Sequence, residues 1–414
     1  MIPSTRPTAS RNTVVLTATR TVRGFGAGAL SVVLALDLQV ALYDPLQIGI
    51  FLGVAMGGAA LWSLLLPRGG GLGSRKFLFA LGSLALAAGG FLLWTDLSNL
   101  GVLLGALALG GIVAGGSDIS PLGALEQGTL AHAAEGERRT LLFAFYNLAG
   151  YLGGAMGALA AGPLRSLALS APNVLPTGPH DPTLLVYGLL GLLLVPSYFL
   201  LSAGSPSQST DTGLRPLSKE HRRPILELSG LFSVDAFGGG LIANALVALF
   251  LELRFHASAG EIGIVLAAAN IAAAVSLLLA VPLARRFGLI NTMVFTHIPS
   301  SVLLILFAFT PALPIAGVVW VARATLSQMD VPTRQSYTQA IVPREEGAAA
   351  AGYTTAARSA QALGAPVSGA FLGAGAVWLA GPFALAGAIK IAYDLALFAR
   401  FRSTKPPEER AGKG

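Results

Sequence analysis

The chain has no cysteine and little charge. The absence of cysteine among 414 residues excludes disulfide bonds, thiol chemistry and cysteine-ligated metals. Charged residues make up 11% of the sequence, whereas a soluble domain carries about 25%. Because 54% of the residues are hydrophobic and the mean hydropathy is +0.69, a soluble core of this size cannot bury the apolar surface. Lipid is therefore the expected solvent for most side chains.

Signatures of catalysis and of ATP use are also missing. The sequence contains no phosphate-binding loop of the Walker type, no Gly-x-Ser-x-Gly turn and no His-Glu-x-x-His pair. Its five histidines are dispersed, without the spacing of metal ligands. We therefore expect no cofactor, no metal and no direct use of ATP. A membrane enzyme would need a nucleophile, a metal or paired acids at one membrane level, and the sequence shows no such set.

Long apolar stretches are what the sequence does contain. About 20 apolar residues cross a membrane as a helix, and twelve stretches are long enough. They cover residues 24–42, 47–67, 77–95, 99–130, 140–163, 183–202, 225–253, 261–283, 291–309, 314–341, 347–376 and 380–399. The sequence thus predicts an all-α integral membrane protein with twelve transmembrane helices.

The positive charges predict the orientation. Of the 27 Lys and Arg residues, 21 fall in the termini and alternate loops, and only Arg165 and Arg254 fall in the opposite loops. This asymmetry predicts a protein of the cell membrane with both termini in the cytoplasm. The net charge of +7 therefore reflects this orientation and does not indicate nucleic-acid binding. The first 20 residues are polar, so we expect no signal peptide and expect the first span to direct insertion.

The second six stretches repeat the first six. Matching segments are Phe25–Gly28 with Phe237–Gly240 (offset 212), Ile48–Ile50 with Ile262–Ile264 (offset 214), and Glu126–Gln127 with Arg334–Gln335 (offset 208). Near-constant offsets indicate a duplicated six-helix unit. The predicted organisation is therefore two pseudo-symmetric bundles at 1–202 and 225–401, a linker at 203–224 and a tail at 402–414.

These features resemble the major facilitator superfamily over essentially the whole chain. The loop at Leu66–Lys76 and its repeat at Pro282–Gly288 keep the glycine and basic residues of the family's loop between helices 2 and 3, but both lack its aspartate. Gly150-x-x-Gly153-Gly154-x-x-Gly157 is similar to a glycine-rich signature in helix 5 of family exporters. The resemblance implies transport by alternating access and hints at export, although helix packing explains the glycines equally well.

Charged residues inside the spans are the candidate functional groups, because a charge in hydrocarbon is costly. The candidates for proton coupling are Asp235, Asp37 and Asp118. The alternative is that these three carboxylates are static or interfacial charges without a role in coupling. Lys390 and Asp394 are four residues apart, which favours a structural pair on the last helix.

The tenth predicted span, residues 314–341 and called helix 10 here, is expected to be broken and to carry part of a gate. Asp330 and Arg334 share one face and can pair, and Pro332 removes a backbone hydrogen bond. Glu126 is the repeat partner of Arg334, so these two residues, with Asp330, are the candidates for a cytoplasmic gate between the halves. A static ion pair is the alternative.

A substrate site is expected near mid-membrane. Arg323 and Arg358 suit a carboxylate or phosphate, unless they pair with Asp118 or Asp235. Further polar candidates for lining this site are Asn147, Tyr146, Asn244, Asn270 and Gln361, all of which can instead join helices.

The sequence thus favours a secondary transporter that exports a small molecule by proton antiport. Proton-coupled or facilitated uptake of an organic anion or nutrient stays open, as does a non-transporting receptor or scaffold on the same fold. The expected partners are the lipid bilayer, a small-molecule substrate and protons or another coupling ion. A monomer suffices for this mechanism.

Overall fold

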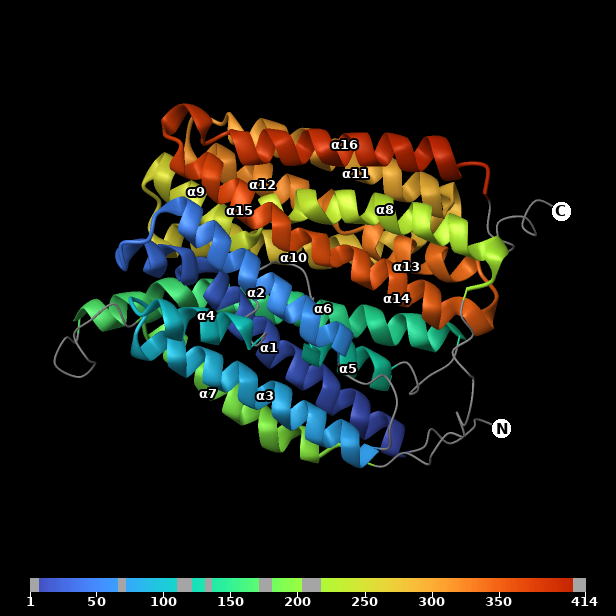
Figure 1. Cartoon of the computed structure of the whole chain (residues 1–414), viewed down its shortest axis with the longest axis horizontal. Helices are drawn as coiled ribbons and strands as arrows, with labels where there is room; N and C mark the ends of the chain where they lie inside the picture. Colours follow the sequence, from blue (N-terminus) through green and yellow to red (C-terminus); the bar gives the residue numbers. More distant parts are fainter. Residues whose placement is uncertain are drawn as a thin grey trace. The chain divides into compact units, whose positions relative to one another are not determined.

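The computed structural model of the chain describes residues 7–65, 72–109, 121–130, 136–170, 181–202 and 217–404. Nearly all of these residues are helical, and the described part contains no β-strand (Figure 1). In the first half the α-helices are α1 (Pro7–Val40), α2 (Pro45–Leu65), α3 (Leu72–Thr95), α4 (Leu100–Ala108), α5 (Pro121–Leu130), α6 (Gly136–Ser170) and α7 (Pro182–Phe199).

The second half contains shorter helical pieces. Its α-helices are α8 (Lys219–Leu241), α9 (Asn244–Phe255), α10 (Ala259–Phe287), α11 (Leu289–Ala308), α12 (Leu313–Ser327), α13 (Asp330–Ala340), α14 (Gly347–Ala357), α15 (Gln361–Gly373) and α16 (Gly381–Phe401). Short 3₁₀ turns occupy Arg344–Glu346, Arg358–Ala360 and Ala376–Trp378.

The helices agree with an all-α membrane protein. Within the described residues, nine helical segments are long and apolar enough to cross a membrane. The other three predicted spans are present in pieces, as α4 and α5, as α12 and α13, and as α14 and α15. The structure is thus consistent with the twelve predicted spans.

The break predicted in helix 10, the tenth predicted span at 314–341, is present, and this span corresponds to α12 and α13. Between α12 and α13 the helix is interrupted at Gln328 and Met329, four residues before Pro332. Proline has no N–H to donate to the carbonyl of residue 328, so the interruption falls where the missing hydrogen bond would be. Pro332 itself lies in the first turn of α13, where proline is tolerated.

Helix α1 begins much earlier than its apolar core. It starts at Pro7, whereas the apolar stretch predicted a start at residue 24. Hydropathy locates the lipid-facing part of a helix and not its ends, and the polar first turns of α1 continue the same helix. Arg23 therefore lies inside α1 and not in a terminal segment.

The chain forms two compact units. The first contains residues 1–208 and 243–271, and the second contains 209–242 and 272–414. In the first unit, α1 packs against α6, and α3 packs against α7; in the second, α11 packs against α16 and α12 (Figure 1). Compactness and duplication are separate properties, so the bundle boundaries at 202 and 225 stay a prediction.

Close helix contacts recur in both units at repeat-related positions. In the first unit, a Cβ at Gly28 would meet the carbonyl of Gly154, and one at Gly157 would meet the carbonyl of Phe25. In the second unit, Gly240 faces the carbonyl of Gln361 in the same way, and Gly364 faces that of Phe237. Each pair of helices thus approaches through residues too small to hold the backbones apart.

Candidate functional site

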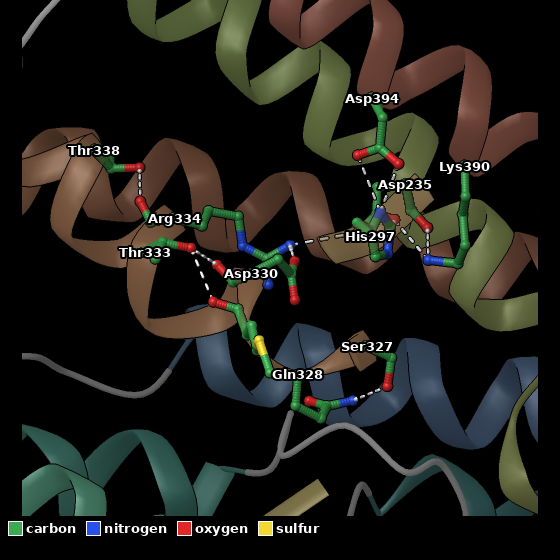
Figure 2. A network of polar contacts seen from close by, with 11 residues as sticks. Asp235, His297, Ser327, Gln328, Asp330, Thr333, Arg334, Thr338, Lys390 and Asp394 are labelled. Carbon is green, nitrogen blue, oxygen red and sulfur yellow. Dashed lines mark hydrogen bonds and ion pairs between the residues drawn. The ribbon is translucent and has the colours of Figure 1, made fainter. Parts of the chain in front are cut away.

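Asp235 on α8 is the centre of a buried polar network in the second unit (Figure 2). Its Oδ1 accepts a hydrogen bond from Lys390 Nζ on α16 at 2.6 Å. Its Oδ2 lies 3.4 Å from Arg334 Nη1 on α13. One carboxylate therefore joins three helices through two cations.

Arg334 is shared between two carboxylates. Besides Asp235, its Nη1 contacts Asp330 Oδ2 at 3.1 Å, which confirms the pairing predicted from their four-residue spacing. Arg334 also lies over the ring of Phe232, with 5.3 Å between the guanidinium carbon and the ring centroid. The network thus fixes the first turn of α13, directly after the break in helix 10.

His297 on α11 extends the network to a fourth helix. Its Nδ1 lies 3.0 and 2.9 Å from the two carboxylate oxygens of Asp394 on α16. Its Nε2 lies 3.9 Å from Asp235 Oδ1. In Figure 2 the imidazole therefore lies between carboxylates that come from two different helices.

The network is buried. The most exposed of its members is Asp235, at 8% of its accessible surface. An isolated charge in hydrocarbon costs at least about 2.5 kcal/mol, so such groups persist only when they are paired. The members of the network, named here together, are Asp235, His297, Asp330, Arg334, Lys390 and Asp394. No group of three or more metal-ligating side chains suited to an ion occurs in the described ranges.

The first unit contains a separate buried ion pair. Arg23 on α1 pairs with Glu126 on α5. The carboxylate of Glu126 also accepts hydrogen bonds from Thr19 at 2.6 Å and from Tyr146 and Tyr198 at 2.5 Å each. Glu126 is completely buried, and its four donors come from three helices, α1, α6 and α7.

The two ion pairs occupy the same positions of the repeat with opposite charge. Arg23 and Asp235 differ by the offset of 212 that relates the first helices of the halves. Glu126 and Arg334 differ by the offset of 208 that relates the fourth helices. Each unit therefore joins its first helix to its fourth by an ion pair, with the cation on the first helix in one unit and on the fourth in the other.

Asp37 lies in a smaller cluster of the first unit. Its Oδ1 contacts Arg165 Nη1 at 2.5 Å, and the same nitrogen lies 3.5 Å from Asp181 Oδ2. Its Oδ2 is buried and has no hydrogen-bond partner within the described part of the chain. Two carboxylates thus share one guanidinium.

The predicted site residues fall into several groups. Asp235, Asp330 and Arg334 come together, and Tyr146 joins Glu126. Asp118 lies outside the described residues. The remaining candidates are placed at Asn147 on α6, Asn244 at the start of α9, Asn270 on α10, Arg358 in the 3₁₀ turn before α15, and Gln361 at the start of α15.

Arg323 on α12 has no ion-pair partner in the described residues. Its guanidinium lies over the ring of Trp320, 4.6 Å from the centroid, and its buried Nε has no hydrogen-bond partner there. The alternative that Arg323 pairs directly with Asp235 is therefore wrong.

The predicted pair on the last helix is also wrong. Lys390 contacts Asp235, and Asp394 contacts His297, so each residue pairs with another helix rather than with its neighbour on α16. Their spacing indicated a shared face correctly, but that face is buried against α8 and α11. Sequence reasoning also missed Arg23 and His297. The repeat offset from Asp235 pointed to Arg23, and a lone histidine in an apolar stretch was the signal for His297.

Comparison with known proteins supports one family. A sequence profile described as Major Facilitator Superfamily matches residues 228–414. The chain is similar to an uncharacterised membrane protein of Saccharomyces cerevisiae, YJR124C, with 23% identity over 95% of this chain and 94% of the yeast protein.

Solved transporters share the fold along nearly the whole chain. The nucleoside transporter NupG has 15% identity and a TM-score of 0.70, covering 94% of this chain and 99% of its own. A bacterial homologue of the human lysosomal transporter Spinster has 18% identity and a TM-score of 0.68, covering 95% of each chain. The human organic anion transporter MFSD10 has 16% identity and a TM-score of 0.65, covering 95% of this chain and 100% of its own.

The described helices are those of a multi-pass membrane protein, and their fold is shared with solved membrane transporters. Residues 228–414 match the model of the Major Facilitator Superfamily, and solved transporters share the fold over nearly the whole chain.

Proposed function

We propose that the protein is a proton-coupled secondary transporter that exports a small organic molecule by alternating access. The observation that carries the proposal is the buried network around Asp235, which places three carboxylates, a lysine, an arginine and a histidine inside membrane-spanning helices. Such a set is expensive to build in hydrocarbon, and proton relays in transporters are made of these residue types. A purely structural role would need far fewer charges.

Asp235 stays the leading candidate for coupling, as part of the network rather than as an isolated carboxylate. Its two direct cation contacts favour the ionised form. Proton binding therefore has to act through the groups around it. Asp37 is the second candidate, because one of its oxygens is buried without a hydrogen-bond partner in the described residues.

The positive charges support the proposed orientation and membrane. The bias of Lys and Arg toward alternate loops supports a cell-membrane protein with cytoplasmic termini. Glu126, Arg334 and Asp330 then lie toward the cytoplasmic ends of their helices. In this proposal the three residues form the gate. When the cytoplasmic side closes, Glu126 leaves Arg23 and Arg334 leaves Asp235, and Glu126 then pairs with Arg334.

Charge exchange tests the gate. Glu126→Arg and Arg334→Glu each place two like charges at the gate, so both single variants should lose transport. The double variant Glu126→Arg/Arg334→Glu should recover part of it. If the double variant transports no better than either single variant, the proposed gate is wrong.

Uptake of an organic anion is the second candidate function. The observation that favours it is Arg323, whose buried Nε has no hydrogen-bond partner among the described residues. A guanidinium suits carboxylate or phosphate groups. An organic anion transporter is also among the proteins that share this fold.

A growth-inhibition panel in an efflux-deficient bacterium separates these functions. Cells expressing the wild type, Asp235→Asn or Arg334→Ala are exposed to cationic drugs, organic acids and toxic oxyanions. Export predicts protection by the wild type alone, and the protected class shows the charge that is carried. Increased sensitivity to organic acids would indicate uptake, and an unchanged panel at good membrane expression would contradict export.

A further inference from the structure

We propose that His297 and Asp394 form the proton-binding site of this transporter. The inference rests on the proposed function and names the groups that take up and release the proton. His297 lies on α11 and Asp394 on α16, two helices that pack against each other along the second unit. Both side chains are buried, with exposed fractions of 4% and 1%.

Carboxylates lie on both sides of the imidazole, one at hydrogen-bonding distance and one at the longer distance of an ion pair. Nδ1 faces both oxygens of Asp394 at 3.0 and 2.9 Å, and Nε2 faces Asp235 Oδ1 at 3.9 Å. A neutral imidazole has one N–H, and its other nitrogen carries a lone pair. In either neutral tautomer a lone pair would point at a carboxylate. Only the protonated ring directs an N–H toward each acid.

The surrounding charges favour an added proton. Asp235 on α8 and Asp330 on α13 contact two cations, Lys390 and Arg334, whereas Asp394 on α16 is paired with His297. The guanidinium of Arg323 on α12 also interacts electrostatically with Asp235 and Asp330, so protonated His297 supplies the positive charge in direct contact with Asp394. The other neighbours are Tyr393 on α16, whose ring lies edge-on to the imidazole, and Arg323 on α12, whose backbone oxygen accepts a hydrogen bond from Ser300.

Loss of this proton would change the contacts between helices. The deprotonated ring repels either Asp394 or Asp235, and Asp235 then depends on Lys390 and Arg334 alone. Asp235 lies on α8 and Arg334 on α13. The protonation state of His297 therefore changes the interactions at the break between α12 and α13. This is a physical route from proton binding to a change in helix packing.

The test measures the protonation of His297 in the full-length protein. Protein with ¹⁵N-labelled histidine is reconstituted in nanodiscs, and the His297 signals are assigned by their loss in His297→Gln. At pH 7 the wild-type ring should show two protonated nitrogens. Asp394→Asn should convert one of them to an unprotonated nitrogen, and Asp394→Glu should retain both. Asp37→Asn, a buried acid of the first unit, should leave the His297 signals unchanged.

A singly protonated His297 in the wild type, or an unchanged ring in Asp394→Asn, would overturn the inference. Ethidium and fluorescein flux into proteoliposomes under a pH gradient distinguishes this outcome from failure of the proposed function. If the wild type moves neither dye in response to the gradient, the proposed coupling fails. If the wild type responds and His297→Gln responds equally, only the assignment to His297 fails.

Discussion

At the scale of single residues, Glu126 is the group whose loss should cost most stability. It is completely buried and neutralises Arg23. Glu126→Gln removes the buried carboxylate that pairs with this guanidinium, and breaking a buried ion pair costs about 3–5 kcal/mol. Tyr198→Phe removes one of four donors and should cost about 1 kcal/mol. Thermal unfolding in detergent measures both, and equal midpoints for the two variants would contradict a central role for this carboxylate.

Glu346 gives a residue-scale prediction about pH, because it lies outside the spans. Burial raises the pKa of Glu346, but hydrogen bonds from Ser218 and His221 outweigh it, so the pKa lies below its usual value. A carboxylate whose pKa is lower in the folded state stabilises the protein at pH values above its pKa in the unfolded chain. This contribution is lost as the pH falls through the pKa of the folded state. Glu346→Gln should therefore flatten the acidic limb of the melting temperature against pH. An acidic limb as steep as that of the wild type would show that Glu346 contributes nothing.

At the scale of helices, two neighbouring glycines on α8 form a matched pair. A Cβ at Gly240 would collide with the carbonyl of Gln361 on α15, whereas a Cβ at Gly239 would meet nothing within 4 Å. Gly240→Ala should therefore destabilise the protein by about 1–3 kcal/mol. Gly239→Ala should leave stability unchanged or improve it, because alanine is the better helix former. Equal effects of the two substitutions on the melting temperature would contradict this close approach.

The break in helix 10 gives a second prediction at this scale. In Pro332→Ala the new N–H can bond to the carbonyl of residue 328 and rejoin α12 to α13. If transport needs the break as a hinge, the rejoined helix should slow transport, and amide exchange around residues 328–332 should slow with it. Pro163→Ala, within the continuous helix α6, is the control. Slower exchange with unchanged transport would separate the break from function.

The scale of helices is also where sequence reasoning was most successful. Apolar length predicted the spans, and Pro332 predicted the break, because both depend on local chemistry. The partners of Lys390, Asp394 and Arg323 were not predictable from spacing alone. Spacing fixes the face of a helix that a residue occupies, but the opposing helix supplies the partner, and that depends on tertiary packing.

At the scale of the whole molecule, the duplicated halves keep one plan with reversed charges. Each unit joins its first and fourth helices by an ion pair, Arg23 with Glu126 and Asp235 with Arg334. The second unit alone adds His297, Lys390 and Asp394 to this pair. The first unit instead surrounds its acid with hydroxyl groups. We therefore propose that the coupling proton binds in the second unit, whereas Glu126 of the first unit acts in the gate.

Proton movement in membrane vesicles tests the central claim most directly. Everted vesicles containing the wild type or Asp235→Asn are energised, and their internal pH is followed while a compound that the wild type exports is added. The account predicts that the compound releases protons from wild-type vesicles and that Asp235→Asn abolishes this release. Transport of the compound by the wild type without any proton movement would contradict proton coupling.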